Sequence, residues 1–171
     1  MTSTVPLQEV TGRVADALAS FGAEPSDLYR ALANNEIVAE LWIRFAWGLR
    51  ENSKTPRALR ELMILRAAQL QEAAYVWRDH TAMAHAEGVS EEQIDALSSW
   101  PSSDLFDEPT RACLALAEEM VAGQVSDETL DCLARWFTAE DRVELIVTAG
   151  FYCMVPRVLN ALRLTSGDTG E

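Results

Sequence analysis

The sequence lacks the short motifs that most often identify an enzyme. It contains no HExxH and no CxxC pair, and its two histidines offer little for a metal centre. No glycine-rich loop that could hold a phosphate is present, nor is the G-x-S-x-G turn of a serine hydrolase. We therefore expect neither a bound metal nor a bound nucleotide, and we do not expect a serine hydrolase.

Positive charge and long apolar runs are also scarce. Lys and Arg number 14 against 27 Asp and Glu, a formal net charge of −13, and the basic residues are scattered. A nucleic-acid or anionic-membrane partner is not expected, because either needs a positive surface. The apolar run at 145–156 is shorter than the roughly 20 residues that cross a bilayer. The N-terminus has no basic start followed by an apolar run, so we expect a soluble, cytoplasmic protein.

Cysteine is too sparse for a disulfide framework. Cys113, Cys132 and Cys153 are odd in number and widely spaced, which fits neither paired disulfides nor a redox dithiol. We expect reduced, buried thiols that pack as small hydrophobic side chains.

Helical periodicity is present along nearly the whole chain. No segment alternates apolar and polar residues as a half-buried strand does, so the pattern predicts an all-α fold in a single domain over 1–171. Apolar spacing, caps, prolines and glycines predict helices over about 6–21, 27–32, 36–52, 56–71, 73–87, 91–97, 109–122, 127–136 and 139–155. Pro156 is expected to break or kink the last helix.

One internal echo suggests two related helical halves. "TPRALREL" at 55–62 and "TAEDRVEL" at 138–145 share Thr, Glu and Leu at equivalent places, each at the start of a helix. This echo predicts a duplication with halves at about 26–100 and 108–165, joined by the polar loop between them. A frayed tail is expected over 166–171.

Glu61 and His80 are the residues best suited to carry chemistry. His80 shares an apolar helical stripe with Val76 and Met83, where a lone histidine is most often a core residue. Glu61 lies near the apolar border of the preceding helix. If the two helices pack antiparallel through a short turn, the carboxylate and the imidazole come within hydrogen-bonding reach. The alternative is a surface Glu61 that pairs with Arg57 at i−4.

The stretches "RALRELMILRAAQLQEAAYVWRDHTAMAHAEG" and "RACLALAEEM", with the following helices up to about residue 165, resemble the carboxymuconolactone decarboxylase and alkylhydroperoxidase-D superfamily. The resemblance implies an all-α, homo-oligomeric protein, a dimer or a trimer, without a cofactor in the decarboxylase branch. Counted from Glu61, the two redox cysteines of the peroxidase branch fall on Ala73 and Val76, and its histidine falls on His80.

The chain therefore departs from the peroxidase pattern at both thiols. Tyr75, Trp77 and His80 are similar to a thiol-poor branch, whose acidic residue between Tyr and Trp is replaced here by Val76. The missing sulfur argues against the dithiol mechanism, because the thiolate is its nucleophile.

The resemblance then implies proton-transfer chemistry. His80 is the expected general acid or base, Glu61 holds the imidazole, and Tyr75 donates a hydrogen bond to a developing oxyanion. Expected substrate-binding residues are Trp77, Trp42, Phe45, Val76 and Ala73.

The predicted function is a lyase or isomerase that acts on a small lactone, enol or cyclic carbonyl compound. Two alternatives stay open at this point. One is a helical ligand-binding or assembly protein without catalysis, and the other is a thiol-dependent peroxidase that uses one of the remaining cysteines.

Overall fold

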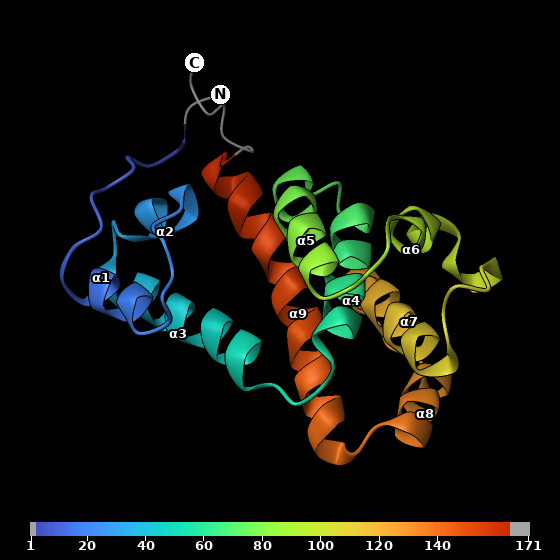
Figure 1. Cartoon of the computed structure of the whole chain (residues 1–171). Helices are drawn as coiled ribbons and strands as arrows, with labels where there is room; N and C mark the ends of the chain where they lie inside the picture. Colours follow the sequence, from blue (N-terminus) through green and yellow to red (C-terminus); the bar gives the residue numbers. More distant parts are fainter. Residues whose placement is uncertain (1–2, 165–171) are drawn as a thin grey trace. The chain divides into compact units, whose positions relative to one another are not determined.

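The computed structural model in Figure 1 describes residues 3–164 and confirms the all-α prediction, since no strand occurs within that range. The helices are α1 (Gly12–Ala19), α2 (Asp27–Leu32), α3 (Glu36–Asn52), α4 (Arg57–Leu70), α5 (Ala74–Ala86), α6 (Glu91–Ala96), the 3-10 helix η1 (Leu97–Ser102), α7 (Glu108–Ala122), α8 (Asp127–Trp136) and α9 (Ala139–Leu162). The tail predicted to fray, 166–171, lies outside the described residues.

The chain forms two compact units. Within the described residues, one comprises 3–53 and 157–164, and the other comprises 54–156. Helix α9 contributes to both, because the second boundary falls at Pro156 and Arg157. The duplication into halves 26–100 and 108–165 stays a prediction.

In the first unit, α1 and α2 pack on α3. Asn35 caps α3 by accepting a hydrogen bond from the backbone N–H of Val38 at 3.2 Å, as its position before the apolar run predicts. The unit's core contains Val14, Ala17, Leu18, Ala39 and Ile43. Apolar residues of α3 also lie outside this core, because Leu41 and Phe45 are 63% and 46% exposed.

The first helix is shorter than predicted. Residues 6–11 are not helical, and their polar groups bind the end of α2 instead. The backbone N–H of Gln8 donates to the carbonyl of Arg30 at 3.1 Å, and the Asn34 amide donates to the carbonyl of Pro6 at 2.7 Å. The second bond occupies the Pro6 carbonyl, which a helix over 6–11 would have used internally.

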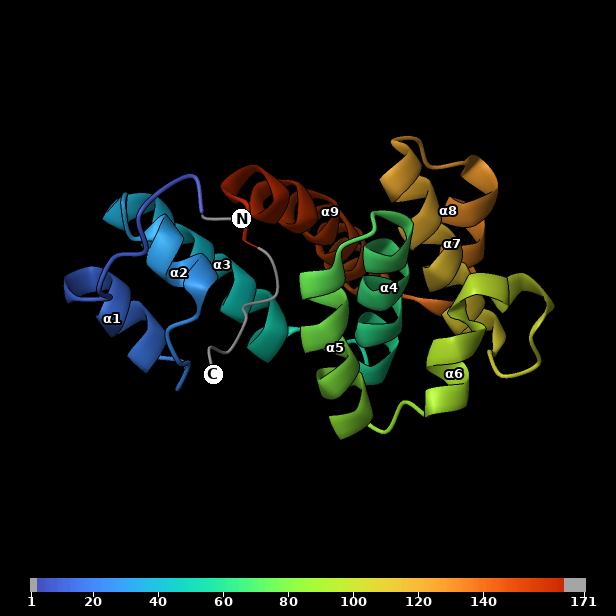
Figure 2. The same cartoon turned by 90° about the horizontal axis from the view of Figure 1, so that it is seen from above.

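The second unit is built around α4, which lies between α5 and α7 in both views (Figures 1 and 2). Leu59 and Met63 face one cluster with α7, α8 and α9, while Leu62 and Leu65 face another with α5, α6 and η1. A charged side chain on a helix that is buried on both sides needs an ion-pair or hydrogen-bond partner. Helix α4 carries two such buried side chains, Glu61 and Arg60.

Helix α9 runs without a break through Pro156, so of the two expected outcomes the break is wrong, and the kink stays a prediction. Proline cannot donate a hydrogen bond to the carbonyl of Tyr152 four residues earlier. That carbonyl accepts a hydrogen bond from the Gln71 side-chain amide at 3.0 Å, so a side chain supplies the donor that the helix lacks.

By length and composition, α9 could also cross a membrane, with a mean hydropathy of 1.5 over its best window. It is the one helix of the described residues with this property, and a core helix meets the same two criteria. Leu145 and Ala149 of α9 are indeed core residues, so length and hydropathy alone do not indicate a membrane span here.

Candidate functional site

Glu61 and His80 meet inside the second unit. Nδ1 of His80 lies 2.6 Å from Oε2 of Glu61, and the side chains are 10% and 0% exposed. The short turn between α4 and α5 lets the two helices lie side by side, as Figures 1 and 2 show. The contact predicted from the antiparallel arrangement is therefore present, and Glu61 is fully buried rather than a border residue.

Glu61 also forms the ion pair with Arg57 that was the alternative prediction. Its other oxygen, Oε1, forms a close ion pair with Nη2 of Arg57, one helical turn earlier on α4. Oε1 makes no hydrogen bond of good geometry among the described residues, so the charge of Arg57 is what stabilises it. The carboxylate thus bridges a guanidinium and an imidazole, so both predicted contacts are present, but the surface position assumed with the Arg57 pairing is wrong.

The bridging explains the ionisation of Glu61. Burial alone would raise the pKa of this carboxyl group, but the hydrogen bond and charge of His80, together with the charge of Arg57, outweigh burial and lower the pKa. Glu61 is therefore an anion that fixes the imidazole in the orientation set by Nδ1.

The free nitrogen of His80 is the group available for chemistry. A carboxylate only accepts hydrogen bonds, so Nδ1 carries the proton that is donated to Glu61. In the neutral ring, Nε2 then has an unshared electron pair. Nε2 makes no hydrogen bond with any residue in 3–164, and the ring keeps a small exposed edge. This is the arrangement that orients a histidine for general base catalysis.

Two further groups that the sequence did not indicate surround the pair. The ring of Tyr152, on α9, packs edge-on against the His80 ring with centroids 4.9 Å apart. Arg60 is 4% exposed, and its Nε donates to the carbonyl of Thr55 at 3.3 Å. Burial, and then the like charge of Arg57, lower the pKa of Arg60. In the sequence, Tyr152 is far from His80 and lies within the apolar run at 145–156. Its hydroxyl group is the one local signal that separates it from an ordinary core residue.

Of the other predicted site residues, Tyr75, Val76 and Trp77 lie on α5 with His80. Tyr75 is half-buried on the first turn of α5, with the Arg78 guanidinium 5.0 Å from its ring centre, and Val76 is 3% exposed in the core. Trp42 and Phe45 lie on α3, in the other unit. Their roles in catalysis or substrate binding stay predictions.

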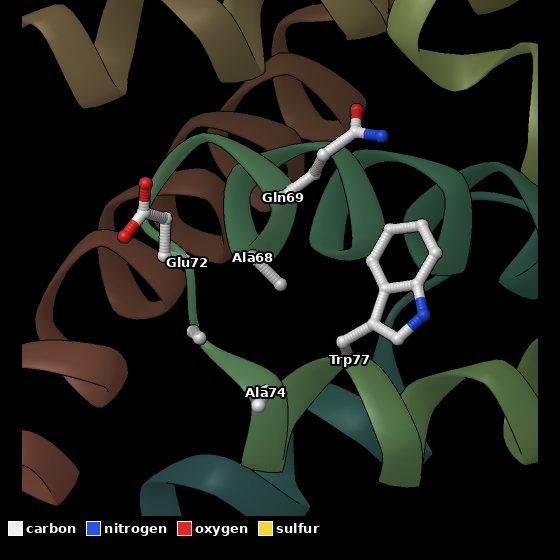
Figure 3. A pocket seen from close by; sticks show the side chains of 6 residues that line it. Ala68, Gln69, Glu72, Ala74 and Trp77 are labelled. Carbon is white, nitrogen blue, oxygen red and sulfur yellow. The ribbon is translucent and has the colours of Figure 1, made fainter.

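Ala73 and Trp77 line a hollow at the turn between α4 and α5 (Figure 3). Its volume is about 350 Å³, and its lining residues are Ala68, Gln69, Glu72, Ala73, Ala74 and Trp77. Glu61 and His80 are not among them, so this hollow is separate from the paired side chains.

The cysteines do not replace the missing thiols. Cys113 is fully buried, and burial, the largest cause, raises the pKa of its thiol far above the ordinary value. Cys132 and Cys153 are half-buried, and neither forms a disulfide within the described residues. No cluster of three or more His, Cys, Asp or Glu that could hold a metal occurs in the described part of the chain.

Comparisons with known proteins agree with this fold. The sequence profile of the carboxymuconolactone decarboxylase family matches residues 36–119. The uncharacterized protein YdfG of Bacillus subtilis (strain 168) is 27% identical over 100 residues, which cover 57% of this chain and 68% of YdfG.

Solved structures extend the similarity over more of the chain. A variant of the debrominase Bmp8, in complex with 2,3,4-tribromopyrrole, has a TM-score of 0.78 at 18% identity and covers 97% of this chain and 94% of its own. A peroxidase-related protein of Silicibacter sp. TM1040, itself uncharacterized, has a TM-score of 0.78 at 15% identity and covers 96% and 91%. At these identities the similarity concerns the fold alone.

Proposed function

The chain belongs to the carboxymuconolactone decarboxylase and AhpD-like superfamily, and on this premise we propose that it is a cofactor-independent lyase or isomerase. The reaction is proton transfer on a small lactone, enol or cyclic carbonyl compound. The observation that carries this proposal is the 2.6 Å contact between His80 Nδ1 and Glu61 Oε2, which leaves Nε2 without a partner among the described residues.

In the proposed reaction, Nε2 removes the proton next to a carbonyl group. The electron pair of the broken C–H bond moves into an enolate, and the imidazole becomes an imidazolium whose charge Glu61 stabilises. The imidazolium then returns the proton to another atom of the intermediate, so no oxidant or reductant is consumed. Arg57 supports the step indirectly, because it keeps Glu61 ionised and in place.

The test is hydrogen–deuterium exchange at carbon. The protein is incubated in D₂O with a panel of small lactones, enols and cyclic ketones, and deuterium incorporation is followed by NMR. His80→Gln should lower the exchange rate about 10²- to 10⁴-fold, the loss typical of a missing acid or base. His85→Gln is the matched control, because His85 is exposed and pairs with Glu91 instead. Equal rates for the His80 variant and the unmodified protein would refute the proposal.

A ligand-binding protein without catalysis is the second candidate. The observation in its favour is that the hollow at the α4–α5 turn does not include Glu61 or His80. It predicts that the Glu61→Gln, His80→Gln double variant keeps full ligand affinity, and that the unmodified protein exchanges no compound of the panel. A thiol peroxidase is disfavoured by Ala73 and Val76 and by the buried Cys113.

We also propose that the protein acts in the cytoplasm as a homo-oligomer, a dimer or a trimer. The exposed apolar side chains on α3, among them Leu41 and Phe45, support self-association because such groups are seldom clustered on a monomer's surface. Native mass spectrometry measures the number of copies directly, and a monomer at micromolar concentration would contradict this part of the proposal.

A further inference from the structure

The hollow at the α4–α5 turn is shallow and open to solvent, and its volume is that of a small ligand. Its volume of about 350 Å³ lies at the lower end of the range for ligand pockets. The small side chains of Ala68, Ala73 and Ala74 leave the space open, and Figure 3 shows Trp77 and Glu72 on opposite sides of it. An aromatic side chain and an exposed carboxylate therefore border the same hollow, although the carboxylate drawn in Figure 3 points away from the indole.

Glu72 is the one charged residue among those that line the hollow. Its side chain makes no ion pair or hydrogen bond within residues 3–164. Arg66, which donates a hydrogen bond to the lining residue Gln69, forms its ion pair with Glu118. With a net charge of −13, the protein as a whole also attracts cations. The charge on the lining therefore favours a positively charged ligand.

Glu72 stands at a backbone position that normally holds glycine. Its φ is +52°, and the backbone N–H groups of Glu72 and Ala73 donate to the carbonyls of Gln69 and Ala68 at 3.3 and 2.9 Å. These two bonds form a Schellman motif, whose left-handed residue is usually glycine. A positive φ alone does not mark a site, since Arg163 also has one. Here, however, the strained turn holds a carboxylate at the rim of a hollow.

Trp77 is a fixed wall of the hollow. Its indole packs partly against the core cluster that contains Leu62, Leu65 and Ala84, which restricts its rotation. Tryptophan is the side chain that attracts a cation most strongly through its ring face. A carboxylate opposite an indole is a combination that suits an ammonium ion carrying apolar substituents.

We propose that this hollow binds a small alkylammonium ion. The charged nitrogen lies toward Glu72, while its alkyl groups cover Trp77 and the alanine side chains. The site does not include Glu61 or His80, so the inference does not rest on the proposed acid–base reaction.

The test compares choline with 3,3-dimethylbutan-1-ol, which has the same shape and hydroxyl group but a neutral carbon in place of the nitrogen. Both are titrated at equal ionic strength, and the indole N–H of Trp77 is followed by NMR after assignment with Trp77→Phe. Choline should shift this signal saturably and bind about two- to fivefold more tightly than the alcohol, the difference expected for an exposed cation–π contact.

The variant test removes the charge and keeps the fold. Glu72→Gln should weaken choline binding up to about fivefold, as expected for an exposed charge pair. Glu87→Gln, another exposed glutamate of the same unit, should leave binding unchanged. His80→Gln should also leave it unchanged, which separates this site from the proposed reaction. Equal binding of the two probes, an unmoved Trp77 signal, or unchanged affinity in Glu72→Gln would each overturn the inference.

Discussion

Replacing Glu61 by Gln tests whether the buried carboxylate carries the charge that the structure assigns to it. Glu61 is 0% exposed and sits between Arg57 and His80. The amide cannot balance the guanidinium charge, and its NH₂ group repels either Arg57 or the Nδ1 proton. Breaking a buried ion pair by removing one partner costs about 3–5 kcal/mol of unfolding free energy. Urea denaturation followed by far-UV circular dichroism measures this loss.

The matched control is Glu87→Gln, an exposed glutamate on the same unit. Surface substitutions of this kind change the unfolding free energy by at most about 0.5 kcal/mol. If Glu61→Gln also lost less than about 1 kcal/mol, Glu61 would not be an ionised, paired group in the folded protein.

The same variant has a predictable pH dependence. Because the folded state lowers the pKa of Glu61, its ionisation stabilises the fold above the unfolded pKa, and this stabilisation is lost as pH falls through the lower folded pKa. The unfolded value is about 4.3. The difference in unfolding free energy between the unmodified protein and Glu61→Gln should therefore shrink below about pH 4. A difference that stayed constant down to pH 3 would contradict this.

Two further predictions concern residues outside the Glu61–His80 pair. Cys113 should resist iodoacetamide in the folded protein, because burial raises the pKa of its thiol, and should react once urea unfolds the chain; mass spectrometry of tryptic peptides detects either result, and rapid native labelling would contradict the burial. Glu72→Gly should raise the unfolding free energy by about 1 kcal/mol, since glycine adopts the positive φ without strain, and urea denaturation showing a destabilised variant would contradict this.

Local signals in the sequence predicted much of the fold. Asn35 caps α3, and Ser90 and Gln93 form a capping box at α6; such bonds follow from local sequence because they join residues only three apart. The contact between Glu61 and His80 could also be predicted from the sequence, because a short turn leaves two consecutive helices few ways to pack.

Contacts between distant segments could not be predicted in the same way. The bond from Gln71 to the carbonyl of Tyr152 lets α9 continue past Pro156, and nothing near the proline in the sequence indicates it. Tyr152 reaches His80 only because α9 packs beside the α4–α5 pair. Both features depend on tertiary packing that overrides local preference.

The tautomer of His80 tests the central claim most directly. Long-range ¹H–¹⁵N NMR distinguishes the two ring nitrogens in the neutral imidazole, and His85→Gln removes the signals of the other histidine. The structure predicts that Nδ1 carries the proton and that Nε2 is unprotonated, ready to accept a proton from a substrate. A neutral ring protonated at Nε2, with Nδ1 bare, would contradict the account.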